Sequence, residues 1–384
     1  MYQKIIAFLF ILFCLNQATT AQKPEIGDAG FKVDKTKFDP RFPAMKHWVK
    51  AGVEGGIPTT KRKIIRVSKI DQIQPAIDKL SKSGGVVLLR NGNYNILKTI
   101  RLRNNVILRG ESKDKVKLYV FLHGIFRKYT TDERVAAIEM KDVNRVAVEN
   151  MTIKYAAATF EPNDRDSMQA PWSIDVYHQC EMRDSTLFVI LVNINNARNC
   201  WVQDCNLLWA GDDPIRIYQS EHITCRRNFI DRCYNKCDGG MGYYSITNSK
   251  YVLICNEKVR RIRHLAIQNG SKYVVVIDNE LEIDINFHNG DAGDNLIESN
   301  HSVIPVWHSW NPIAIGDKSK HQPPGSGNVL YNNSFTDKHG KLIHSDAGVV
   351  YLMANEWGAQ SVIKSKTLQP PITFYPVIYP TKKR

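Results

Sequence analysis

The residues best suited to acid–base chemistry gather in one short stretch. The segment RRIRHLAIQNG, residues 260–270, places Arg261, Arg263 and His264 close together, and His288 follows one repeat later. Imidazole gives or takes a proton near neutral pH, and guanidinium binds a carboxylate through two parallel hydrogen bonds. The stretch therefore indicates proton transfer beside a bound anion.

The elements that carry these residues repeat along the chain. Short strands with alternating apolar residues are each followed by asparagine, at positions 150, 206, 228, 256, 279, 300 and 333. Most repeats span roughly 20 to 30 residues, and such a unit buries its apolar face only by stacking on neighbours. Asparagine suits the corner because it tolerates left-handed backbone. We therefore expect an all-β fold, a parallel β-helix, with Asn206, Asn228, Asn256 and Asn279 stacked at one corner.

The start of the repeat region carries a resemblance to a known superfamily. IDQIQPAIDKL, residues 70–80, predicts a short amphipathic N-terminal helix that caps the solenoid. GGVVLLRNGNYNI and TIRLRNNVILRGES then read as strands with glycine and asparagine turns. This order resembles the pectate-lyase-like superfamily of secreted carbohydrate-active enzymes over most of residues 64–345. The resemblance implies a right-handed parallel β-helix with an extended groove that binds a glycan chain.

The chain is expected to divide into four parts. Residues 1–21 hold an apolar run and small residues up to Ala21, which predicts a cleavable signal peptide and a secreted or periplasmic protein. Residues 22–63 are expected to be irregular, 64–345 to form the β-helix catalytic domain, and 346–384 to form a C-terminal strand and a proline-rich tail. Nothing after the signal peptide predicts a membrane span.

Charge and cysteine content narrow the range of partners. The chain has 52 basic and 38 acidic residues and a net charge of +14, which favours a polyanionic partner. Export makes an anionic polysaccharide or oligosaccharide the expected partner, and no nucleic-acid-reading motif is present. Cys14 leaves with the signal peptide, and the odd number of remaining cysteines predicts buried thiols instead of a paired framework. We expect a monomer.

Counted from each asparagine, unusual side chains recur at similar places in successive repeats. Because successive turns of a β-helix lie about 4.8 Å apart, these side chains are expected to form one ridge, with a local bulge bringing His288 into line with His264 and His308. The residues predicted to bind substrate on this ridge are Arg261, Asp213, Tyr234, Trp307 and His308.

The ridge predicts β-elimination from a uronate, the reaction of a carbon–oxygen lyase. Arg263 would neutralise the carboxylate and make the neighbouring proton acidic. His264 and His288 would act as base and proton donor in an order left open, with Tyr244 as alternative acid. The leaving group is a sugar in a polysaccharide lyase and water in an oligosaccharide dehydratase, and the sequence does not separate them.

Two other functions stay open. GDDP, residues 211–214, is similar to the Gly-Asp-Asp of polygalacturonases, although their other motifs are missing; it supports a glycoside hydrolase in which Asp212 or Asp213 pairs with Asp284. A glycan-binding solenoid without activity is the third interpretation.

One loop raises the question of a cofactor. HNGDAGDN, residues 288–295, offers Asp291 and Asp294 as oxygen ligands for Ca²⁺ but lacks a full ligand series. A calcium ion at this loop stays open, and no metal ligands are assigned at the ridge.

Overall fold

The computed structural model describes residues 25–59, 62–124, 134–158, 186–236, 241–306, 308, 310–346, 348–353, 362–365 and 370–379. The predicted signal peptide and Trp307 therefore lie outside the described residues. No helix in the described ranges has the length and apolar character needed to cross a membrane.

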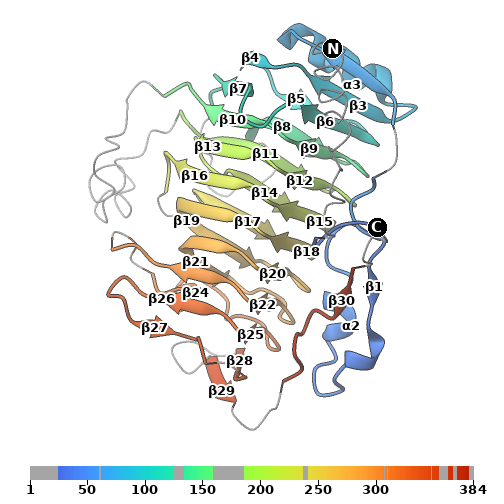
Figure 1. Ribbon diagram of the computed structural model, residues 1–384. Helices are drawn as coiled ribbons and strands as arrows, with labels where there is room; N and C mark the ends of the chain where they lie inside the picture. The colour runs from blue at the N-terminus through green and yellow to red at the C-terminus, as the bar shows by residue number, and fades with distance from the viewer. Residues whose placement is uncertain are drawn as a thin grey trace, which may run out of the picture.

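The chain winds through three faces, each a ladder of strands from successive turns (Figure 1). Face 1 is a 12-stranded sheet of β2 (Ile64–Val67), β3 (Gly85–Leu89), β6 (Val106–Gly110), β9 (Ala147–Glu149), β12 (Trp201–Gln203), β15 (Glu221–Arg226), β18 (Lys250–Cys255), β20 (Val275–Ile277), β22 (Leu296–Glu298), β25 (Val329–Tyr331), β28 (Val350–Met353) and β29 (Val362–Ser365).

Faces 2 and 3 belong to one 16-stranded sheet. Face 2 consists of β4 (Gly92–Ile96), β7 (Val116–Val120), β10 (Thr152–Tyr155), β13 (Asn206–Ala210), β16 (Phe229–Cys233), β23 (His301–Val303), β26 (Ser334–Thr336) and β27 (Leu342–Ile343). Face 3 consists of β5 (Ile100–Arg101), β8 (Val135–Lys141), β11 (Val189–Asn195), β14 (Ile215–Tyr218), β17 (Tyr243–Thr247) and β24 (Ile313–Ile315). Two long strands, β19 (Lys258–Gln268) and β21 (Glu280–His288), run through both faces.

Among the described strands, those from β2 to β26 pair with one another in parallel. The pairs made by β27, β28 and β29 at the C-terminal end of the solenoid are antiparallel, as is the pair of β1 with β30. Strands joined by crossovers in one direction stack as coils, and right-twisted strands make those coils right-handed. The predicted all-β, right-handed parallel β-helix is confirmed.

The predicted cap is also present. The short helices η2 (Ile70–Gln72) and α3 (Ile73–Leu80) lie at one end of the solenoid, and α3 buries Ile73, Ile77 and Leu80 against the first coil (Figure 1). The segment before it forms β1 (Lys32–Val33), η1 (Lys35–Lys37) and α2 (Met45–Trp48), and β1 pairs with the C-terminal strand β30 (Val377–Ile378). These elements lie together along one side of the solenoid (Figure 1).

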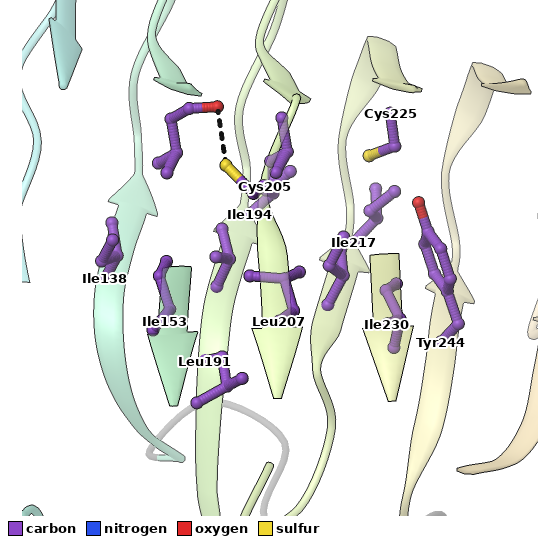
Figure 2. Packing of buried hydrophobic residues seen from close by; sticks show 14 of the residues in the cluster. Ile138, Ile153, Leu191, Ile194, Cys205, Leu207, Ile217, Cys225, Ile230 and Tyr244 are labelled. Atoms are coloured by element: carbon purple, nitrogen blue, oxygen red, sulfur yellow. Dashed lines mark hydrogen bonds between the residues drawn. The ribbon is translucent and has the colours of Figure 1, made fainter. Parts of the chain in front are cut away.

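The interior is filled by the alternate residues of each strand. Figure 2 shows Ile217, Leu207 and Ile230 stacked between the faces, with Tyr244 and Cys225 in the same interior. Free, buried thiols occupy five of these positions, namely Cys200, Cys205, Cys225, Cys233 and Cys255, as predicted for the described cysteines. Burial raises the pKa of each, so these thiols are unreactive packing groups.

A ladder of buried amides joins the turns at the corner between faces 1 and 2, here called the asparagine corner. The Glu257 amide donates to Asn279 Oδ1 (2.9 Å), the Asn279 amide to Asn300 Oδ1 (3.1 Å), and the Asn300 amide to Asn333 Oδ1 (2.9 Å). One turn earlier, Asn228 holds the same position and its Nδ2 donates to Glu257 Oε1 (2.7 Å). Each rung thus satisfies a backbone group that the corner leaves unpaired.

The predicted stack is wrong at two of its four members. Asn228 and Asn279 belong to the ladder, but Glu257 takes the place expected for Asn256. Asn256 comes one residue before the ladder position and is exposed, with left-handed backbone (φ 55°). Asn206, the first residue of β13, comes one residue after it. A one-residue offset decides which side chain faces inward, so similar sequence motifs occupy different places.

Candidate active site

Faces 2 and 3 meet at a second corner, here called the 2–3 corner, formed by residues 209–214, 232–236, 241–243, 261–264 and 283–284. Trp209, Arg232 and Arg261 stand at the same place in three successive turns, and all three have left-handed backbone (φ 56°, 70° and 55°). They end the face 2 strands and turn the chain onto face 3. Polar and aromatic residues follow directly in each turn.

A buried hydrogen-bond network lies at this corner. His264 Nδ1 is 2.6 Å from Asp284 Oδ1, and His308 Nε2 is 3.1 Å from the same oxygen. His308 Nε2 is also 2.9 Å from the carbonyl oxygen of Arg263, and the Trp310 amide donates to His308 Nδ1 (3.2 Å). The network brings His264 and His308 onto the same carboxylate, with His308 contributed by the segment between β23 and β24.

The partners fix the position of each proton. A carbonyl oxygen only accepts, so His308 Nε2 carries a hydrogen that it shares between Arg263 and Asp284. The ionised Asp284 likewise accepts from His264 Nδ1–H. In the described part of the chain no hydrogen bond reaches His264 Nε2, which keeps its lone pair. His264 is therefore arranged as a general base whose ring Asp284 orients.

Charge and burial favour this protonation state. Burial lowers the pKa of His264 to about 4, although Asp284 acts in the opposite direction. Burial alone would raise the pKa of Asp284, but His264 and His308 together hold it at about 2. Above about pH 4 the pair is thus a neutral imidazole beside a carboxylate.

The same three side chains offer one metal-ligand atom each within 4.8 Å of one another. Two imidazoles and a carboxylate are a ligand set for zinc or iron. A metal, however, needs the lone pair of His308 Nε2, and the hydrogen bond to the Arg263 carbonyl places a proton there. In the protonation state that these hydrogen bonds require, the three side chains form a proton-transfer network.

His288 does not share the register of His264. The strands pair His264 with Asp284 and Gln268 with His288, because the bulge in β19 lies before His264. The predicted alignment of the histidines is therefore wrong in the backbone. The two imidazoles are linked through Tyr243, whose ring centre lies 4.9 Å from that of His264 and 5.9 Å from that of His288. Burial lowers the pKa of His288 to about 2, with His321 as the next cause, so His288 is neutral.

Tyr244 is not part of the site. It is fully buried in the interior, and its hydroxyl lies beside Cys225 (Figure 2). The neighbouring residue, Tyr243, faces the histidines instead. Side chains alternate between the two faces of a strand, so the predicted acid is wrong by one residue.

The arginines of the opening stretch separate into two groups. Arg263 is buried (4% exposed), and its guanidinium carbon lies 5.6 Å from the centre of the Tyr243 ring. Arg261 is half-buried, and its Nε lies 3.2 Å from Asp231. Arg263 thus lies beside Tyr243 and the histidines. The positive charge of Arg261 is instead paired with the carboxylate of Asp231 on face 2.

Two further carboxylates lie at the corner, two turns before His264. Asp212 and Asp213 are buried, and one nitrogen of Arg134 lies 3.0 and 3.5 Å from their oxygens. Burial raises the pKa of both, and for Asp213 the neighbouring Asp212 raises it further. The turn that holds Asp284 is three steps of about 4.8 Å away, so the predicted pairing of Asp284 with either residue does not form.

The loop suggested for calcium is closed by hydrogen bonds. Asp291 Oδ1 accepts from the Gly293 amide (2.8 Å) and from the side-chain amides of Asn295 and Asn328 (3.1 and 3.0 Å). Asp294 forms an ion pair with Lys272 (3.1 Å). Because these oxygens already have donors, the Ca²⁺ interpretation of this loop is not supported.

Sequence reasoning missed three participants. The sequence offers two adjacent tyrosines, and the prediction selected Tyr244 instead of Tyr243. Ile246 and Tyr244 are two residues apart in β17 and both face the interior, so Tyr243 faces the other way. Arg134 and Trp310 come from distant parts of the chain, and no local pattern marks them. Tyr234, predicted to bind substrate, is half-buried at the corner, beside Trp209.

Neither a protein-family model nor a curated protein matches this chain. Solved structures similar to it include an exopolygalacturonase from Thermotoga maritima (13% identity, TM-score 0.44, 75% of this chain and 82% of that chain). An endo-xylogalacturonan hydrolase from Aspergillus tubingensis (15%, 0.45, 72% and 73%) and an iota-carrageenase complexed to iota-carrageenan fragments (13%, 0.44, 70% and 59%) are others. The likeness concerns the fold alone. These neighbours are β-helix enzymes that degrade glycans.

Proposed function

We propose that this protein is an exported lyase that cleaves a uronate-containing anionic polysaccharide or oligosaccharide by β-elimination. The observation that carries the proposal is the pairing of His264 Nδ1–H with the buried Asp284, which leaves Nε2 as a proton acceptor. A neutral histidine oriented in this way can remove the proton on the carbon next to a carboxylate. Two carboxyl groups, as in a glycoside hydrolase, are weaker bases for this step.

The neighbouring groups fit the other needs of the reaction. The charge of Arg263 acts on both histidines and can neutralise the uronate carboxylate, which makes the C5 proton acidic. His264 takes this proton, the electron pair forms the C4–C5 double bond, and the C4–O bond breaks. Trp310 Nε1 has no hydrogen-bond partner in the described ranges and is a free donor next to His264.

The departing oxygen needs a proton from a second group. His288, with a pKa lowered to about 2 by burial, is a neutral imidazole near neutral pH and has no acidic imidazolium proton to donate. The phenol of Tyr243 contacts both imidazoles and is the better donor. We therefore assign His264 as base, Tyr243 as acid and His288 as a substrate contact.

Product analysis tests this proposal directly. Polyuronates and their oligomers are incubated with the enzyme, and the ultraviolet absorbance of the new double bond is followed together with reducing ends. Both signals should rise together for a lyase, whereas absorbance without chain cleavage indicates removal of water at a chain end. New reducing ends without absorbance would refute elimination.

A glycoside hydrolase is the second candidate, and the carboxylates of Asp212 and Asp213 favour it. They share Arg134, and the pKa of Asp213 is raised well above its usual range by burial and by Asp212, as in an acid that protonates a leaving group. Asp213→Asn would then abolish release of reducing ends, and His264→Ala would leave it nearly unchanged. The lyase predicts the reverse order.

A further inference from the structure

An aromatic platform stands at the end of face 2, next to the proposed reaction site. The Trp209 ring lies 5.5 Å from the Tyr234 ring, and Tyr234 lies 5.9 Å from Tyr155. Tyr155 is fixed from below because its hydroxyl donates to the Leu122 carbonyl (2.9 Å). Trp209 and Tyr234 are both half-buried, and Tyr234 also packs against the interior cluster.

Positive charge surrounds this platform. Three guanidinium groups converge on the single carboxylate of Asp231, from Arg232 (2.6 Å), Arg260 (3.2 Å) and Arg261 (3.2 Å). The Arg232 guanidinium carbon lies 4.7 Å from the centre of the Trp209 ring. Glu282 stands opposite Arg260 on β21 and is a second carboxylate beside the cluster, so two carboxylates face three guanidinium groups among the described residues. The side chain of Arg260 is 35% exposed. The cluster therefore keeps a positive charge beside an aromatic surface.

The platform connects to the reacting groups through short segments. Asp212 and Asp213 lie three and four residues after Trp209, just beyond the end of β13. The Tyr243 amide donates to Asp213 Oδ1 (2.7 Å). In the third turn, Arg261 lies just before Arg263. If the reacting sugar of a glycan chain lies at the 2–3 corner, the next sugar in the chain is expected to contact the platform.

We propose that Trp209 and Tyr234, with Arg260 and Arg261, form a subsite for an anionic sugar adjacent to the sugar that reacts. The apolar face of the ring packs on Trp209. Its anionic group, a carboxylate or a sulfate ester, binds the guanidinium groups. The inference rests on the proposed function for the kind of polymer, and it assigns Trp209 as a determinant of specificity that acts through binding.

Calorimetric titration separates this role from catalysis. The probes are a polyuronate oligomer, a sulfated galactan oligomer without uronate, and a neutral glucan of equal length. Trp209→Ala and Arg260→Gln should each raise Kd for an anionic probe at least tenfold, and the charge-dependent part should weaken with salt. In turnover assays Trp209→Ala should raise KM more than it lowers kcat.

Matched controls come from other parts of the solenoid. Tyr273 is a half-buried aromatic residue with the same left-handed backbone (φ 58°) but lies at another corner, and Arg66 is exposed on face 1. Tyr273→Ala and Arg66→Gln should bind the anionic probe like the parent protein. Thermal unfolding of every variant checks that it is folded.

The outcomes distinguish the two proposals. If the parent protein binds no anionic glycan, the proposed function fails together with the subsite. If it binds but Trp209→Ala and Arg260→Gln bind equally well, only the subsite is refuted. If the neutral glucan binds as tightly as the anionic probes, the subsite is not specific for an anionic sugar. If Arg260→Gln weakens binding of only one anionic probe, that probe shows whether the subsite recognises a carboxylate or a sulfate.

Discussion

The two corners that flank face 2 arise from the same repeat but use their side chains differently. At the asparagine corner, Asn279 accepts from the Glu257 amide and donates to Asn300 Oδ1 (2.8 Å) and to the Ile254 carbonyl (3.1 Å). Asparagine holds this position in four turns, at Asn228, Asn279, Asn300 and Asn333. At the 2–3 corner, the residue type changes from one turn to the next.

This difference separates stabilisation from function. A repeated amide with every group paired holds neighbouring turns together and offers nothing to a ligand. The 2–3 corner instead gathers Asp213, Tyr243, His264 and Asp284 from successive turns, and it holds Asp213 and His264 with shifted pKa values. Groups with perturbed pKa values that lie together are the pattern expected of an active site.

The largest expected effect is at the 2–3 corner. His264→Ala removes the proposed base and should lower turnover by at least about a hundredfold. The buried Asp284 loses a partner, so the melting temperature should fall as well, and turnover is compared at a temperature where both proteins are folded. Because the pKa of His264 is about 4, activity of the parent protein should fall as the pH drops through about 4 and the base is protonated. His301→Ala, an exposed histidine on β23, is the control and should keep full turnover. Unchanged turnover in His264→Ala would make the corner structural.

The asparagine corner should respond in the opposite way. Asn279→Ala removes the acceptor of the Glu257 amide and one donor to each of the Ile254 carbonyl and Asn300 Oδ1. Each buried group left unsatisfied costs about 1–3 kcal/mol. Denaturant unfolding should show a loss of about 2–4 kcal/mol, with kcat of the folded protein retained. A kcat that falls in proportion to stability would show that the two corners are coupled.

Adjacent tyrosines give a finer test. Tyr243→Phe removes the proposed acid and should lower turnover about tenfold or more. Tyr244→Phe removes a hydroxyl in the interior, which has no hydrogen-bond partner in the described part of the chain, and should change turnover less than about twofold. Steady-state kinetics of both variants decides between the two positions, and the reversed ranking would contradict the placement of the acid.

A further expected effect at the asparagine corner is a pH dependence of stability. Burial raises the pKa of Glu257 to about 8 from an ordinary value of 4.5, so the folded protein holds a proton that the unfolded chain has lost between these values. Stability should therefore fall as pH rises from about 4.5 to about 8. Glu257→Gln removes this titrating group, so the melting temperature of the variant should decrease less steeply with pH between about 4.5 and about 8 than that of the parent protein. Parallel curves for variant and parent would refute it.

The sequence by itself determined the solenoid. The alternation of apolar residues and the recurring asparagines are local patterns, and each unit must stack to bury its apolar face. The cap helix α3, the buried thiols and the placing of His264 and Arg263 close together in one repeat follow from the same local patterns.

Only the tertiary structure decided which side chains meet. A bulge in β19 and a one-residue offset place Tyr243 instead of Tyr244 beside His264, because side chains alternate between core and surface and a slip of one residue exchanges them. His308 and Arg134 reach the corner from connections between strands, whose paths no periodicity describes. The repeat fixes the height of each turn along the solenoid, whereas bulges and connections fix the contacts on which the chemistry depends.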